Sequence, residues 1–146
     1  MKQTKMVSFL LALILTCGIF SLASCSKEED NLSRIYVNAD EVISYLDIEP
    51  TSIFEGMTLY DFLRDDETME ADIDRSTNPD TILSVCNVYA GSGEQFVFYS
   101  SDASDATEGA PAIEYDGNTL YRVDGNYMAT PIKQGCKYLI RLEKIN

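Results

Sequence analysis

The 146-residue chain contains no histidine and no tryptophan, and it has only four cysteines. Without histidine, a Ser-His-Asp triad, a Cys-His dyad and a histidine-based zinc site are all excluded. Neither a GxxxxGK[ST] phosphate loop nor a GxGxxG motif after a strand occurs. We therefore expect a protein that is not an enzyme and that carries no cofactor.

Basic residues are also scarce, with 11 lysines and arginines against 24 aspartates and glutamates. The formal net charge of −13 argues against nucleic acid and anionic lipid as partners, because both require a basic surface. Residues 1–24 contain two lysines and no acid, so the remaining 122 residues carry a formal charge of −15. That charge allows basic proteins or divalent cations as partners.

The N-terminus has the organisation of a secretory signal. Lys2 and Lys5 precede an apolar run, Val7 to Phe20, which is shorter than the roughly 20 residues of a membrane span. The step Leu22-Ala23-Ser24-Cys25 resembles the lipobox of bacterial lipoproteins. The resemblance implies that residues 1–24 are removed and that Cys25 is lipidated, which would anchor the protein in a membrane.

The residues after Cys25 read Ser-Lys-Glu-Glu-Asp, and this run resembles the acidic export tag of Bacteroidota-type lipoproteins. The resemblance implies an outer-membrane location facing the cell exterior. A charge-rich terminus is also typical of a solvated tether. We predict a signal peptide over 1–24, a lipidated acidic tether over 25–34 and one globular domain over 35–146.

Two cysteines remain in that domain, Cys86 and Cys136. In an oxidising compartment two cysteines favour one disulfide, and two buried free thiols that act as small apolar residues are the alternative.

Two helical patterns precede the strand-rich part. Asn38 followed by Glu41 resembles a capping box, and the apolar spacing predicts a helix over 39–47. Thr58 with Asp61 predicts a second helix start. The segment GMTLYDFLRDD, residues 56–66, resembles the helix start of β-grasp domains.

Strand patterns follow from Thr81 onward. A first hairpin is predicted from residues 81–89 and 95–100, and a second from 119–123 and 127–132. A short strand is predicted over 112–115. Residues 136–145 form the clearest predicted strand, with Cys136, Tyr138, Ile140 and Leu142 on one face and Lys137, Arg141 and Glu143 on the other. The fold class predicted is α+β, with two short N-terminal helices followed by an antiparallel sheet of about six strands. The alternative is an all-β barrel or sandwich.

Carboxylates are the remaining catalytic groups. The pairs Asp72/Asp74 and Asp102/Asp105 could support glycoside hydrolysis, but such pairs arise by chance among 24 acids. Calcium is a weak alternative for Asp102, Asp105 and Glu108, whose spacing does not match the EF-hand loop. We predict no metal site otherwise.

Tyrosine is abundant, with nine residues. Tyrosine gives good contact area at low entropic cost, although it is also ordinary strand composition. The candidate contact surface comprises Tyr99, Tyr115, Tyr121 and Tyr127.

The leading hypothesis is a non-enzymatic surface module that binds a protein or a glycan. Residues 93–117, GEQFVFYSSDASDATEGAPAIEYDG, resemble inhibitors related to the propeptides of streptopain-like proteases. This implies, as an alternative, inhibition of a secreted cysteine protease. That family continues into a helix, whereas residues 119–145 have strand patterns here. A small carboxylate-based glycan hydrolase is the third hypothesis.

Overall fold

A computed structural model describes residues 32–123 and 127–145. The chain divides into two units, Met1–Asn31 and Leu32–Asn146, and only the second is described. The predicted signal peptide, Cys25 and the acidic run after it therefore lie outside the described residues. The first strand begins at Ser33, so the last residues of the segment predicted as tether belong to the fold.

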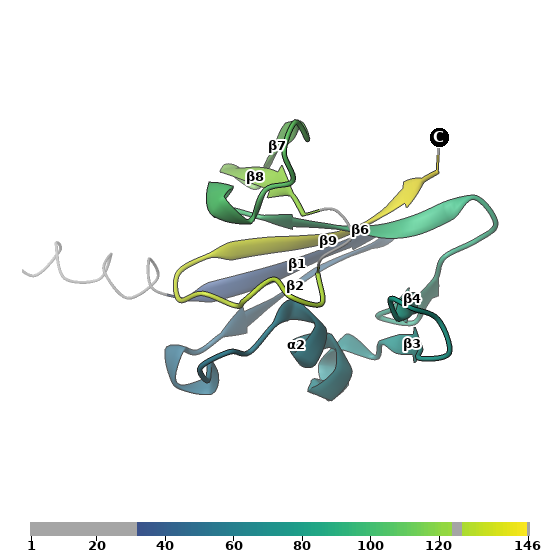
Figure 1. Ribbon diagram of the computed structural model, residues 1–146, viewed down its shortest axis with the longest axis horizontal. Helices are drawn as coiled ribbons and strands as arrows, with labels where there is room; N and C mark the ends of the chain where they lie inside the picture. The colour runs from purple at the N-terminus through teal and green to yellow at the C-terminus, as the bar shows by residue number, and fades with distance from the viewer. Residues whose placement is uncertain (1–31, 124–126, 146) are drawn as a thin grey trace, which may run out of the picture. The chain divides into compact units, whose positions relative to one another are not determined.

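A six-stranded mixed sheet forms the centre of the described unit, in the order β2-β1-β9-β6-β8-β7 (Figure 1). The β1–β9 pair is parallel and the other neighbours are antiparallel. The strands are β1 (Ser33–Ala39), β2 (Val42–Ile48), β6 (Glu94–Ser100), β7 (Ala112–Tyr115), β8 (Asn118–Arg122) and β9 (Lys137–Lys144).

The helix predicted over 39–47 is wrong, because these residues form the β1–β2 hairpin. Asp40 in the two-residue turn adopts a positive φ of 51°, which ends any helix there. The spacing of Val42, Ile43 and Leu46 fits a helical stripe as well as a strand. Seven paired residues with β1 and the β-branched side chains decide in favour of the strand.

The helix start predicted at Thr58 is confirmed by α2 (Leu59–Asp65). The Thr58 side chain accepts from the Asp61 backbone N–H, and the Asp61 carboxylate accepts from the Thr58 backbone N–H, which is a capping box. Phe62 and Leu63 bury the helix against the sheet.

A second sheet of three strands, β3-β4-β5, lies on the same side as α2 (Figure 1). Its strands are β3 (Asp72–Asp74), β4 (Thr81–Val85) and β5 (Val88–Tyr89). Cys86 and Asn87, both with positive φ, turn the chain between β4 and β5. The single strand predicted over 81–89 and its pairing with 95–100 are therefore wrong; β6 pairs with β9 and β8 instead. Short 3-10 turns are η2 (Pro50–Ser52), η3 (Glu67–Met69) and η4 (Ala103–Asp105).

The β7–β8 hairpin turns over the opposite face of the six-stranded sheet (Figure 1). Its tip is the predicted turn at Asp116 and Gly117, both at positive φ. The second predicted hairpin is wrong, because residues 127–132 contribute only an isolated bridge from Pro131 to Thr58.

Two apolar clusters lie on the two faces of the sheet. The larger joins the sheet to α2 and the small sheet, and the smaller lies beneath β7–β8. The predicted α+β class with two N-terminal helices and an antiparallel sheet is thus overturned. The described residues contain one α-helix and two sheets, one of which is mixed. In this part of the chain no helix has the length and apolar character needed to span a membrane.

Candidate functional site

A cluster of tyrosines lies on the face of the six-stranded sheet over which β7–β8 folds, away from α2. It forms where the tip of β7–β8 contacts the β1–β2 hairpin. Tyr36 comes from β1, Tyr45 from β2 and Tyr115 from β7. A cavity of about 470 Å³ is lined by these three tyrosines together with Ile43, Ser44 and Asp116. These six residues are called the tyrosine surface below.

The register of the β1–β2 hairpin brings the first two rings together, since Tyr36 is paired directly with Tyr45. Their ring centroids lie 6.4 Å apart. The Tyr115 ring meets Tyr36 edge-on at 5.3 Å, a favoured geometry for aromatic pairs. Tyr36 is 5% exposed, whereas Tyr45 is 59% and Ile43 is 71% exposed. The cluster thus has one buried ring, that of Tyr36, and an exposed edge formed by Tyr45 and Ile43, which is called the open rim below.

Asp116 ties the hairpin tip to the sheet. The Tyr36 hydroxyl donates to Asp116 Oδ2 at 2.7 Å. Burial raises the pKa of the Tyr36 hydroxyl, and the hydrogen bond to Asp116 raises it further. The hydroxyl is therefore a proton donor at neutral pH, and one carboxylate oxygen of Asp116 remains available at the exposed tip.

Arg34, on β1, contacts two residues of β2, Asp47 and Tyr45. Its guanidinium donates to both carboxylate oxygens of Asp47, with Nε–Oδ1 at 2.5 Å and Nη2–Oδ2 at 2.9 Å. The hydrogen bonds from Arg34 lower the pKa of the Asp47 carboxyl. The same guanidinium lies 4.2 Å from the centroid of the Tyr45 ring, which is a cation–π contact.

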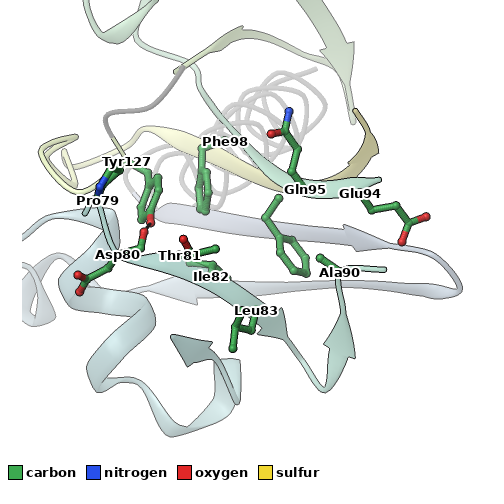
Figure 2. A pocket seen from close by; sticks show the side chains of 11 residues that line it. Pro79, Asp80, Thr81, Ile82, Leu83, Ala90, Glu94, Gln95, Phe98 and Tyr127 are labelled. Atoms are coloured by element: carbon green, nitrogen blue, oxygen red, sulfur yellow. Dashed lines mark hydrogen bonds between the residues drawn. The ribbon is translucent and has the colours of Figure 1, made fainter. Parts of the chain in front are cut away.

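A second groove lies on the other face, between the small sheet and β6 (Figure 2). Its volume is about 370 Å³. Ile82 and Leu83 line it from β4, and Phe96 and Phe98 line it from β6. Tyr127 stacks on Phe98 at 4.6 Å between centroids, and its hydroxyl donates to the Asp80 carbonyl. The groove is formed by members of the main core cluster and their immediate neighbours.

The four tyrosines predicted as one contact surface do not lie together. Tyr99 is 4% exposed and packs in the smaller core, with its hydroxyl donating to Glu143. Tyr127 packs in the main core on the opposite face, and Tyr121 is half-buried on β8. Only Tyr115 belongs to the tyrosine surface.

The structure does bring together Asp102 and Asp105, two of the three residues considered for calcium. Lys133 Nζ donates to Asp102 Oδ2 at 2.6 Å and to Asp105 Oδ1 at 2.7 Å. The ammonium group therefore lies where the two carboxylates could share a cation, and it lowers the pKa of Asp102. Glu108, the third residue considered, is exposed.

The remaining carboxylate pair, Asp72 and Asp74, lies on β3. Asp74 accepts from the backbone and hydroxyl of Ser76, so it shapes the turn after β3. Within residues 32–123 and 127–145, no group of three or more acidic or cysteine side chains is placed to hold a metal ion.

The predicted disulfide is not formed, since Cys86 and Cys136 are both free and half-buried. Cys86 lies near the Ser44 side chain of β2, while Cys136 directly precedes β9. Burial raises the pKa of the Cys86 thiol, as expected for an unreactive cysteine.

Tyr36 and Tyr45 are the functional candidates that the sequence reasoning missed. Tyr45 falls within residues 39–47, which are predicted as a helix, and Tyr36 lies just before that segment. The available signal was the alternation through Ile35, Val37 and Ala39, which marks a strand that ends at an Asp-Glu turn.

Comparison with known proteins gives a likeness of fold. No protein-family model matches the chain, and no curated protein matches it. The structure is similar to the crystal structure of a "putative metal binding protein" from Ruminococcus gnavus ATCC 29149, with a TM-score of 0.51. The sequence identity is 12%, over 80% of this chain and 99% of the other. At this identity, the likeness shows a shared fold.

Proposed function

We propose that this chain is a lipid-anchored surface protein that binds another protein, without catalysis, through its tyrosine surface. The observation that carries the proposal is the convergence of Tyr36, Tyr45 and Tyr115 from three strands around one open cavity. Large apolar side chains at its rim, Ile43 and Tyr45, are mostly exposed.

Physical chemistry favours this surface as a contact site. Tyrosine combines a wide apolar face with a polar tip and loses little rotamer entropy on binding, so it is enriched where proteins meet. Arg34 stacks on Tyr45, and Asp116 bonds to Tyr36, so the rings are held in place before a partner arrives. A preformed surface lowers the entropic cost of association.

The lipobox and the acidic run that follows it support the anchoring half of the proposal. Replacing Cys25 with alanine would remove the acceptor sulfur. We expect labelled palmitate to enter the wild-type protein and not the Cys25→Ala variant, which should also leave the membrane fraction. Equal labelling of the two proteins would contradict the assignment of Cys25.

The name of the structural neighbour mentions metal binding. At 12% identity, the likeness supports a common fold only. Proteins with one fold commonly have unrelated functions, which reside in individual sites.

Site-specific photo-crosslinking on intact cells tests the tyrosine surface. A photoreactive phenylalanine analogue would replace Tyr45 in the full chain, and the control would carry it at Tyr89. Tyr89 is 62% exposed and lies on β5, in the sheet covering the opposite face. We expect discrete protein adducts from position 45 and few from position 89. Similar adducts from both positions would remove the tyrosine surface as a specific site.

A glycan is the second candidate ligand, and one observation favours it. The cavity of about 470 Å³ has the size of a small-ligand site and pairs aromatic rings with the Asp116 carboxylate. Calorimetric titration of oligosaccharides into wild type and Tyr45→Ala would detect such binding.

No observation favours the protease-inhibitor or hydrolase alternatives: β8 and β9 lie where the inhibitor family continues into a helix.

A further inference from the structure

The edge of β2 lies beside the tyrosine surface. Strand β2 is the first strand of the six-stranded sheet, and among residues 32–123 and 127–145 no strand pairs with its outer side. Such an edge presents unpaired backbone donors and acceptors. A seven-residue strand offers enough of them to receive another strand.

The register shows which residues present these groups. The Arg34 backbone N–H donates to the Cys136 carbonyl, so even-numbered residues of β1 face β9 and odd-numbered ones face β2. Val37 is paired with Ser44, and Ile35 with Leu46, so the even-numbered residues of β2 are bonded to β1. The backbone groups of Ile43, Tyr45 and Asp47 therefore point to the open edge.

The protective features usual for an edge strand are weak here. β2 contains no proline, lysine or bulge, and its pairing with β1 is regular over seven residues. Its outward side chains include Ile43 and Tyr45, which are exposed. An incoming strand would place alternate side chains against these two.

Charge indicates the chemistry of the partner. Asp40 and Glu41 lie at one end of β2, and Glu49 follows the other end; all three are exposed. Asp116 lies exposed at the tip of the neighbouring hairpin. Asp47 is paired with Arg34, so the basic residue nearest the edge is already neutralised. The edge thus has an apolar centre between acidic ends.

The same charges disfavour a second copy of this chain as the occupant. Antiparallel self-pairing centred on Tyr45, which aligns all seven residues of β2, would set Glu41 opposite Glu49 of the other copy. Like charges directly opposite each other in a sheet are destabilising.

We propose that the edge of β2 accepts an extended segment of a partner protein, with alternating apolar residues flanked by lysine or arginine, as an added antiparallel strand. This rests on the proposed function and specifies its partner. Backbone hydrogen bonds to Ile43, Tyr45 and Asp47 pair the added strand with β2, and the tyrosine surface contacts its side chains. The acidic residues at the two ends of β2 favour a segment that is flanked by basic residues.

The probe is an acetylated, amidated peptide of alternating valine and threonine with paired lysines at each end, added to the full-length chain in detergent. Amide exchange measured by NMR should slow at Ile43, Tyr45 and Asp47, while the amide of Ser44, already bonded to β1, should change little. Replacing the lysines with glutamate should weaken binding about tenfold or more. A peptide N-methylated at alternate amides, which keeps its side chains, should not bind.

The matched variants are Ile43→Pro and Ile43→Ala. Proline removes the N–H that faces the open edge and no bond to β1, and edge strands tolerate it. We expect Ile43→Pro to weaken peptide binding about tenfold relative to Ile43→Ala. The proposal is overturned if the N-methylated peptide binds equally well or if the exchange of the three amides is unchanged. Sedimentation of the chain alone as a dimer would overturn the choice of occupant.

The crosslinking experiment separates this inference from the proposed function. Here the photoreactive analogue is placed at position 115, in place of Tyr115. If the partner binds as a strand, its adducts should disappear when Ile43→Pro is added. If the adducts persist in Ile43→Pro but disappear in Tyr45→Ala, strand addition is wrong and binding through the tyrosine surface is supported. Adducts unaffected by both changes would reject both proposals.

Discussion

The two faces of the six-stranded sheet are built from alternate residues of the same strands, yet they are covered to different extents. In β1, Ile35 and Val37 point to the face closed by α2 and the small sheet, and both are essentially inaccessible to solvent. Tyr36, between them, points to the face over which the β7–β8 hairpin folds. One strand therefore supplies main-core residues on one side and, on the other, the buried ring of the tyrosine surface.

The difference arises from the elements that cover each face. The hairpin β7–β8 reaches Tyr36 with its tip and leaves the β2 side of that face open. The opposite face has its groove between the small sheet and β6, but that groove is lined by side chains that also pack the main core (Figure 2). Changes in the groove should therefore cost stability, whereas changes at the open rim should alter binding.

The largest expected difference between the faces concerns α2. Leu63 is 1% exposed in the main core. We expect Leu63→Ala to lower the free energy of unfolding by about 2–5 kcal/mol, because it removes buried methyl groups and leaves a cavity. Ile43→Ala on the open rim should change it by less than about 0.5 kcal/mol. Urea denaturation of both variants makes the comparison, and a large loss at Ile43 would show that the rim is part of the core.

The second prediction concerns Tyr99 beneath β7–β8. Burial, followed by the hydrogen bond to Glu143, raises the pKa of Tyr99 to about 12, against about 10 in an unfolded chain. The folded state thus favours the protonated hydroxyl, so its contribution is complete below about pH 10 and is lost as the pH rises towards 12.

Tyr99→Phe should lower the free energy of unfolding at pH 7 by about 1.5–3 kcal/mol, since a hydrogen bond to a charged group is lost. Its stability should then fall less steeply than that of the wild type between about pH 10 and 12. Tyr89→Phe, at an exposed site, is the control. Parallel pH profiles for wild type and Tyr99→Phe would contradict the role given to the buried hydroxyl.

The third prediction concerns the tip of β7–β8. Tyr36→Phe removes the hydrogen bond to Asp116 and should cost about 1 kcal/mol. Tyr45→Phe, at a ring that is 59% exposed, should cost less than about 0.5 kcal/mol. Thermal unfolding of the two variants measures the difference. Equal effects would mean that Asp116 does not fasten the hairpin to the sheet.

The elements that sequence predicted correctly are those with local signals. The capping box at Thr58 and Asp61 lies within one turn of chain, and it marks α2. The apolar face of β9 is likewise visible in a short window, because Tyr138 and Ile140 are buried in the main core and Leu142 packs against it. The parallel pairing of β1 with β9 joins residues about a hundred positions apart, and no local pattern encodes it.

The candidate site was harder to predict because it forms where two hairpins that are far apart in the sequence, β1–β2 and β7–β8, come into contact. Tyr115 was chosen from the sequence, but its neighbours Tyr36 and Tyr45 reach it only through the β1–β2 register and the fold of the β7–β8 hairpin. Lys133 likewise comes from a distant segment to neutralise Asp102 and Asp105. The residue types therefore indicated which side chains could form a site, whereas the tertiary structure determines which of those side chains are in contact.

The smallest expected effect is at Arg34, where the rim meets β1. Arg34→Lys keeps the charge but replaces a planar fork that bonds Asp47 twice and stacks on Tyr45. Because the pair is partly exposed, the free energy of unfolding should fall by less than about 1 kcal/mol, and less still at high salt. The Tyr45 ring should become more mobile, which NMR relaxation can measure against Asp47→Asn as a control. A loss well above about 1 kcal/mol would place Arg34 with the core residues instead, and would mean that the open face also helps to hold the β1–β2 hairpin together.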